Sequence, residues 1–187
     1  MSDETGRTAE RRSEGGILRW VVETAALLLA AFVLAQLIRT FVVQPYVVPT
    51  GSMIPTIGIG DRVLANKFVY RFRDPSQGDI IVFDDLTGRT PTLIKRVVAT
   101  EGQEVDILDG GVYVDGERLS EPYVDGQETQ PGPVQLPVTI PPDHVWVMGD
   151  NRTNSADSRW IGPQPLSVVE GEAFMTYWPP GRIGRLR

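Results

Sequence analysis

The chain has 187 residues, enough for one domain of ordinary size and a membrane anchor. Its 18 basic and 24 acidic residues give a net charge of −6, and without a basic patch this excludes general binding to nucleic-acid phosphates. The chain has no cysteine and one histidine, His144, which excludes thiol catalysis, disulfides and multi-histidine metal clusters; we expect no cofactor and no metal.

The N-terminal part predicts a tail and a membrane span. Residues 1–16 are polar and of mixed charge, which predicts a short disordered tail. Residues 17–43 are apolar over more than the about 20 residues that a spanning helix needs. They are apolar on nearly every face, unlike a core helix, and residues 36–40 offer no convincing small-x-small cleavage site, unlike a cleavable signal. We therefore predict a transmembrane helix over 17–43.

Arginines are unevenly placed around this span. One arginine, Arg39, closes it, whereas four precede it: Arg7, Arg11, Arg12 and Arg19. Positive charge favours the cytoplasmic side. This predicts a single-pass protein with a cytoplasmic N-terminus and an extracytoplasmic domain over residues 44–187.

Short runs of valine, isoleucine and aromatic residues follow, separated by Gly, Pro and Asp. Asp109-Gly110-Gly111 and Asp115-Gly116 are tight-turn signals that make 104–119 a small meander, whereas the proline-rich segment 121–142 is read as irregular. The predicted class is mostly β, a folded-over antiparallel sheet or barrel-like domain. The predicted strands are 41–48, 62–70, 79–83, 93–100, 104–108, 112–115, 144–148 and 173–178.

One serine stands on an unusually stiff turn. Ser52 lies between Gly51 and Met53, with Pro49 and Pro55 on either side. Proline fixes φ and glycine permits unusual φ, so the hydroxyl is held on a sharply turned backbone. An isolated loop serine is usually only a turn residue, so its role depends on the rest of the chain.

Two further segments carry polar groups of interest. Lys95 stands in an apolar strand, and alternation places it on the face of Leu93 and Val97. A strand lysine usually faces solvent, but among apolar neighbours its pKa falls and the neutral amine can act as a general base. The second segment, 149–159, is a dense polar loop that lacks the EF-hand spacing of a calcium site.

Taken together, these segments resemble the four conserved boxes of bacterial type I signal peptidases, in the family's order. The resemblance implies a serine endopeptidase in the bacterial plasma membrane, which uses a Ser-Lys dyad to remove signal peptides from exported preproteins. The matching residues are 49–56, Gly60-Asp61-Arg62-Val63 with Asn66-Lys67, Lys95-Arg96-Val97, and Gly149-Asp150-Asn151-Arg152 through Ser155, Asp157-Ser158-Arg159 and Gly162.

The resemblance also implies roles for individual residues. Ser52 is the expected nucleophile and Lys95 the expected general base. The hydroxyl of Thr50, where many relatives have serine, is expected to share the oxyanion hole with the Ser52 N–H. Ser155 is expected to hydrogen-bond and orient the lysine, and Asp157 to support that polar network.

The expected substrate is an extended signal peptide with small residues at alternate positions before the cut. It would add a strand against residues 46–50 and 92–94, with Val48, Met53 and Ile94 lining a shallow apolar pocket. The expected partners are signal peptides and the lipid bilayer, with no nucleic acid, and the protein is expected to be a monomer. Two alternatives stay open: a self-cleaving repressor-type peptidase, and a single-pass β-rich adaptor that binds peptides without cutting them.

Overall fold

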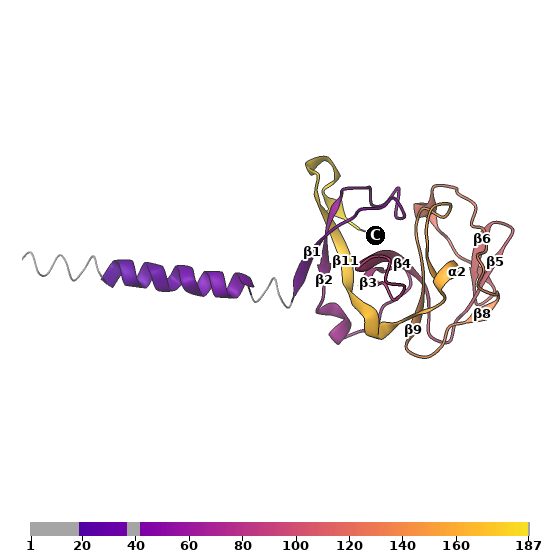
Figure 1. The fold of residues 1–187 in the computed structure, drawn as a ribbon, viewed down its shortest axis with the longest axis horizontal. Coiled ribbons are helices and arrows are strands. Elements are labelled where there is room, and N and C mark those ends of the chain that lie inside the picture. Colours follow the sequence, from indigo (N-terminus) through magenta and orange to yellow (C-terminus); the bar gives the residue numbers. More distant parts are fainter. Residues whose placement is uncertain (1–18, 37–41, 187) are drawn as a thin grey trace, which may run out of the picture. The chain divides into compact units, whose positions relative to one another are not determined.

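The computed structural model describes residues 19–36 and 42–186, which form two units divided after Val42. The first unit contains the helix Arg19–Gln36, which is long and apolar enough to cross a membrane and buries none of its residues (Figure 1). The predicted tail, and residues 17–18 and 37–41 of the predicted span, lie outside the described residues. Val42 lies in a turn and Val43 already belongs to the first strand.

The second unit is built mainly from one large antiparallel sheet. Its strands follow the order β1-β2-β11-β3-β4-β9-β10, with β12 paired to β11. Register shifts in β11 and β4 mark irregularities of the kind that bend strands and fold a sheet over. The mostly β class is confirmed. The strands are β1 Val43–Val47, β2 Arg62–Asn66, β3 Ile80–Asp84, β4 Thr92–Thr100, β9 His144–Met148, β10 Gln164–Pro165, β11 Val169–Trp178 and β12 Gly184–Arg185.

A smaller sheet of order β7-β6-β5-β8 contains the predicted meander. Asp109 and Asp115 have positive φ, as does the glycine after each, which closes the tight turns that the sequence predicts. The segment 121–142 is not wholly irregular, because β8 pairs with β5 from within it. These strands are β5 Glu104–Leu108, β6 Gly111–Val114, β7 Glu117–Arg118 and β8 Val138–Thr139.

Helices are short in the described part of this unit. α2 spans Ser158–Ile161, and the 3-10 turns are η1 Val69–Arg71, η2 Pro122–Val124, η3 Leu166–Val168 and η4 Pro180–Arg182. The strand predicted over 62–70 ends at Asn66. Its side-chain oxygen accepts hydrogen bonds from the N–H groups of Phe68 (2.9 Å) and Val69 (3.2 Å), which turns the chain into η1.

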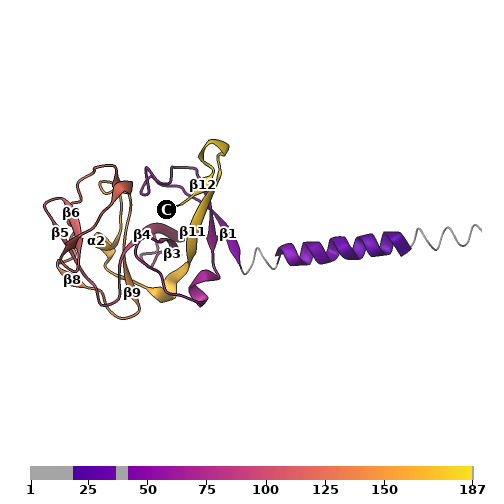
Figure 2. The ribbon, with the colours of Figure 1, turned by 180° about the vertical axis from the view of Figure 1, so that it is seen from behind.

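Apolar side chains form three buried clusters that hold these layers together. One lies between the small sheet and strands β4 and β9, and includes Trp146 and Val105. Another joins β1, β2 and β3 to the loop after β1, through Met53 and Ile57. Figure 2 shows the small sheet and β1 at opposite sides of this unit, with β3 and β4 between them. The loop that carries Ser52 is therefore anchored by its own buried residues.

Candidate functional site

The loop between β1 and β2 presents Ser52. Its two ends are joined by backbone hydrogen bonds, from Val48 N to Asp61 O (2.9 Å) and from Gly60 N to Val48 O (2.8 Å). Within it, Met53 and Ile57 are fully buried. Since both ends and the middle of the loop are fixed, Ser52 is held in place although it lies outside any strand.

Ser52 and Lys95 meet below the protein surface. Lys95 Nζ lies 2.8 Å from Ser52 Oγ and 2.8 Å from the carbonyl oxygen of Ile94. Ser52 is 6% exposed and Lys95 only 2%. The lysine comes from β4 and the serine from a loop 43 positions earlier, so the sheet brings together two groups that the sequence separates.

Burial controls the charge of this lysine. Removing the ammonium from water lowers the pKa of Lys95 to about 8, and the negative charges of Asp157 and Asp150 oppose the shift only in part. A base with a pKa near the working pH is suited to proton transfer. The lowered pKa agrees with the prediction made from the apolar strand around Lys95.

The polar loop after β9 packs directly on the nucleophile loop. The Asn151 backbone N–H donates to Ser52 O and its side-chain Nδ2 donates to Gly51 O, both at 3.0 Å. A Cβ on Gly149 would lie 2.4 Å from Ser52 O and 2.3 Å from Ser155 Oγ, so only glycine fits there. These contacts fix the backbone on either side of the Gly51–Ser52 bond, and no sequence pattern predicts this role for Asn151.

A buried ion pair ties this loop to the lysine strand. Arg96 donates to both oxygens of Asp150, from Nε at 2.9 Å and from Nη2 at 2.6 Å, and both residues are almost fully buried. Thr56 donates to the same carboxylate from the nucleophile loop. Asp150 therefore connects the three segments that form the site.

Asp157 and Ser155 differ in whether they make the hydrogen bonds that the sequence predicts. Asp157 is fully buried, accepts from Gly149 N (3.0 Å) and pairs with Arg159 Nε (2.8 Å), so it braces the loop. The hydrogen bond predicted from Ser155 to Lys95 is absent, because the amine points to Ser52 and to the Ile94 carbonyl instead. Ser155 Oγ is buried without a hydrogen-bond partner in the described structure.

Thr50 lies beside the nucleophile, with Oγ1 3.5 Å from Ser52 Oγ. A hollow of about 280 Å³ lies next to it, between β1 and β4, and Val48 and Ile94 line it as expected. The prediction that Met53 lines this hollow is wrong. Its side chain is fully buried in the core cluster that fixes the loop, and leaves no surface for a substrate.

Among the described residues, His144 makes no hydrogen bond to Ser52 or Lys95. The His144 ring nitrogen Nδ1 lies 2.7 Å from the Pro142 carbonyl oxygen, at the start of β9. Within residues 19–36 and 42–186, no cluster of acidic or histidine side chains could hold a metal ion. The geometry is suited to attack by a serine hydroxyl, with a neutral lysine as its base.

Comparison with known proteins identifies relatives over most of the chain. Residues 19–178 match the family model described as "Signal peptidase, peptidase S26". A probable signal peptidase I-2 from Synechocystis sp. is 37% identical, over 100% of this chain and 86% of its own. The signal peptidase I of Mycobacterium tuberculosis is 36% identical, over 88% of this chain and 75% of its own. A signal peptidase I crystal structure from Enterococcus faecalis is 29% identical, with a TM-score of 0.48, and covers 54% of this chain and 97% of its own.

Proposed function

The chain belongs to the signal peptidase family, peptidase S26, and from this we propose how its residues cut a signal peptide. It is a membrane-associated signal peptidase, an endopeptidase that cleaves signal peptides. The observation that carries the mechanism is the 2.8 Å separation between Lys95 Nζ and Ser52 Oγ in a site from which water is largely excluded.

The reaction begins with a proton transfer. With a pKa of about 8, roughly a tenth of Lys95 is neutral at pH 7, against about one part in 3,000 at the ordinary lysine pKa. Neutral Lys95 takes the Ser52 proton as Oγ attacks the scissile carbonyl carbon. The lysine then gives that proton to the leaving amine, and water repeats the cycle on the acyl-enzyme.

Negative charge develops on the carbonyl oxygen during the attack. We assign its stabilisation to the Ser52 backbone N–H and the Thr50 hydroxyl, which already lies next to Ser52 Oγ. Asp157 has a positioning role. With Arg159 it stabilises the polar loop after β9, which packs on the loop that carries Ser52. The Ser155 hydroxyl lies in the same loop. It and the Ser52 carbonyl oxygen both lie close to Gly149, next to the position that a Gly149 Cβ would occupy.

The signal peptide binds as an added strand between residues 46–50 and 92–94. The hollow of about 280 Å³ there is bounded by Val48 and Ile94, each close in sequence to a member of the dyad, and it suits small side chains before the cut. We further propose that the protein is a monomer and crosses the plasma membrane once, with its N-terminus in the cytoplasm. The helix then keeps the peptidase unit near the membrane that holds the apolar part of the substrate.

The test uses purified full-length protein, a preprotein in detergent, and sequencing of the new N-terminus. Wild type should release the mature chain, whereas Ser52→Ala and Lys95→Ala should release none. His144→Ala is the matched control and should cut at the wild-type rate. Cleavage by either Ser52→Ala or Lys95→Ala would contradict the proposed mechanism. Failure of a serine-acylating inhibitor to label the wild type would favour a peptide-binding adaptor instead.

A further inference from the structure

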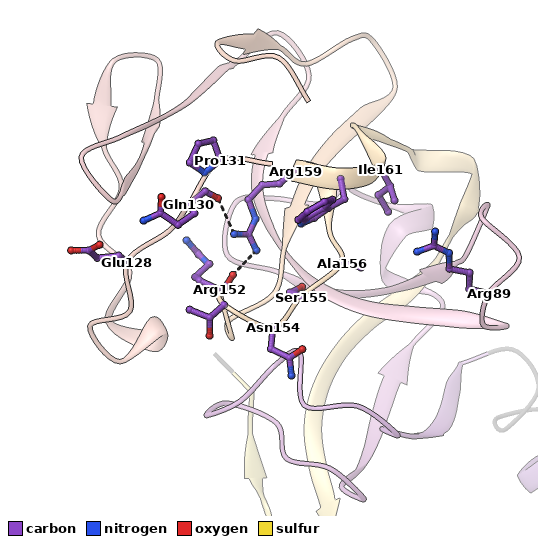
Figure 3. Close-up of a pocket in the computed structure, with 12 residues that line it drawn as sticks. Arg89, Glu128, Gln130, Pro131, Arg152, Asn154, Ser155, Ala156, Arg159 and Ile161 are labelled. Atoms are coloured by element: carbon purple, nitrogen blue, oxygen red, sulfur yellow. Dashed lines mark hydrogen bonds between the residues drawn. The ribbon is translucent and has the colours of Figure 1, made fainter. Parts of the chain in front are cut away.

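A second hollow lies next to the dyad and has no part in the mechanism above. It encloses about 600 Å³ and shares no lining residue with the hollow between β1 and β4 (Figure 3). Ser155 lines it, and Ser155 Oγ and Ser52 O both lie within 2.4 Å of the position that a Gly149 Cβ would occupy. Through Ser155, the lining of the second hollow therefore reaches the part of the polar loop after β9 that packs against the Ser52 backbone.

The arginines in this hollow are of two kinds. Arg152 and Arg159 are buried, and their guanidinium groups pair with Glu121 and Asp157, so they serve the fold. Arg89 is different: it is exposed, and its guanidinium makes no hydrogen bond or ion pair with any residue of the described ranges 19–36 and 42–186. Figure 3 shows it at one end of the hollow, with Ser155 between it and Glu128 at the other.

Arg89 is presented by a fixed turn. The Asp85 carboxylate accepts hydrogen bonds from the backbone N–H groups of Thr87 (2.8 Å), Arg89 (3.1 Å) and Thr90 (3.0 Å). Burial raises the pKa of Asp85, but the hydrogen bond from the Thr87 hydroxyl (2.6 Å) and those from the three backbone N–H groups together outweigh it and lower the pKa to about 2. Thr90 lines the first hollow and Arg89 the second, so this turn separates the two. The turn fixes the Arg89 backbone, and its guanidinium, which is free of other partners among the described residues, can pair with a ligand carboxylate.

One wall of the hollow is an exposed indole. Trp160 is 60% exposed, whereas its neighbours in α2, Ser158 and Arg159, are buried. Asp157 caps this short helix by accepting from Arg159 N, which stabilises the backbone that carries Trp160. Ile161 continues the apolar wall. An exposed tryptophan on a rigid support offers a large contact surface at small entropic cost.

An endopeptidase must hold its substrate on both sides of the cut, and the first hollow serves only the signal-peptide side. We propose that the second hollow binds the first residues of the mature chain, on the carboxyl side of the cut, and that Arg89 makes it favour an acidic residue there. This inference rests on the proposed function. Trp160 supplies the apolar contact to the same segment. The preference for an acid rests on Arg89 alone, because Arg152 and Arg159 are already paired and the Glu128 carboxylate lies at the opposite end of the hollow.

The first test compares preproteins that differ only in Asp, Asn or Lys at each of the first four positions after the cut. The readout is the ratio of kcat/KM for Asp to that for Lys, which does not depend on the fraction of active enzyme. An exposed ion pair changes affinity by up to about fivefold, so the ratio should reach about five at one position or more. Arg89→Glu should bring it below one, and 0.5 M NaCl should shrink both effects.

The matched control is Arg118→Glu, an exposed charge reversal in β7 of the small sheet. It should keep the wild-type ratio. A ratio that is the same in wild type and Arg89→Glu at all four positions would overturn the inference. Cleavage of the Asn preprotein by wild type tests the proposed function separately, so the two can fail independently.

The second test concerns Trp160 and uses substrate length. Wild type should lose about fivefold in kcat/KM when the substrate is shortened to one residue after the cut, because an aromatic contact contributes about 1 kcal/mol. Trp160→Ala should lose less than twofold on the same shortening. Equal losses in both enzymes would show that the mature segment does not contact this wall, and would contradict the proposal.

Discussion

The C-terminal segment holds the nucleophile loop, and one arginine carries most of that contact. Arg182 Nε lies 2.8 Å from Asp61 Oδ2, and its Nη2 lies 3.3 Å from Pro55 O and 3.4 Å from Thr56 O. The same Asp61 oxygen accepts from Gly58 N at 2.8 Å. We predict that Arg182→Ala loosens the loop and thereby slows attack by the serine.

The magnitude follows from the exposure of the two partners. The Arg182 side chain is 43% exposed and that of Asp61 only 3%, so the pair lies between a surface ion pair, about 0–1 kcal/mol, and a buried one, about 3–5 kcal/mol when broken. We expect Arg182→Ala to lower the free energy of unfolding by about 2 kcal/mol. For a domain of this size, this corresponds to a Tm lower by about 5 °C.

The assay combines thermal unfolding in detergent with the rate at which a serine-directed inhibitor acylates Ser52. Ser52 of Arg182→Ala should be acylated about tenfold more slowly than Ser52 of wild type, at a temperature where the variant is fully folded. Arg182→Lys should recover part of the rate, because lysine keeps the positive charge but lacks the several N–H donors of the guanidinium. Arg185→Ala, in the exposed strand β12, is the matched control. Wild-type Tm and wild-type acylation in Arg182→Ala would refute this reasoning.

Three further predictions concern other parts of the site. Thr50→Ala should lower kcat by about a hundredfold and Thr50→Ser only slightly, because loss of one oxyanion donor has about this effect; equal rates in all three enzymes would contradict the oxyanion assignment. Arg96→Met should lower the free energy of unfolding in urea by about 3 kcal/mol or more, since it leaves the Asp150 carboxylate buried without its cation. The double variant Arg96→Met/Asp150→Leu should recover much of that loss, and a double variant as unstable as Arg96→Met would contradict this reasoning. His144→Ala should leave the pH dependence of cleavage unchanged, because among the described residues its ring hydrogen-bonds only to the Pro142 carbonyl; a changed pH dependence at low pH would contradict this.

Local sequence patterns predict much of the fold. Alternation and turn residues locate β5 and β9 with the observed bounds, and they place Lys95 in an apolar strand. Three of the four two-residue strands, β8, β10 and β12, are too short to leave such a pattern, and they form because longer strands beside them offer free backbone groups. The short strands were therefore not predictable from local sequence.

In the site, too, local sequence predicts some residues and not others. Ser52 and Lys95 are found from their unusual surroundings in the sequence, whereas Arg182 and Asp61 are 121 residues apart and have no local feature that links them. Met53 was misread for a related reason. Its place next to the serine predicts contact with substrate, but the turn directs its side chain into the core. Which side of a loop residue faces solvent is decided by tertiary packing.

The proposed mechanism requires Lys95 to be neutral when it takes the serine proton. The pH dependence of kcat/KM tests this, for a preprotein in which no group titrates between pH 6 and 10. Because the neutral amine is the active form, kcat/KM should rise with pH, reach half its maximum near pH 8, and level off above that. A midpoint near 10.5, or a rate that does not change with pH over this range, would contradict the account.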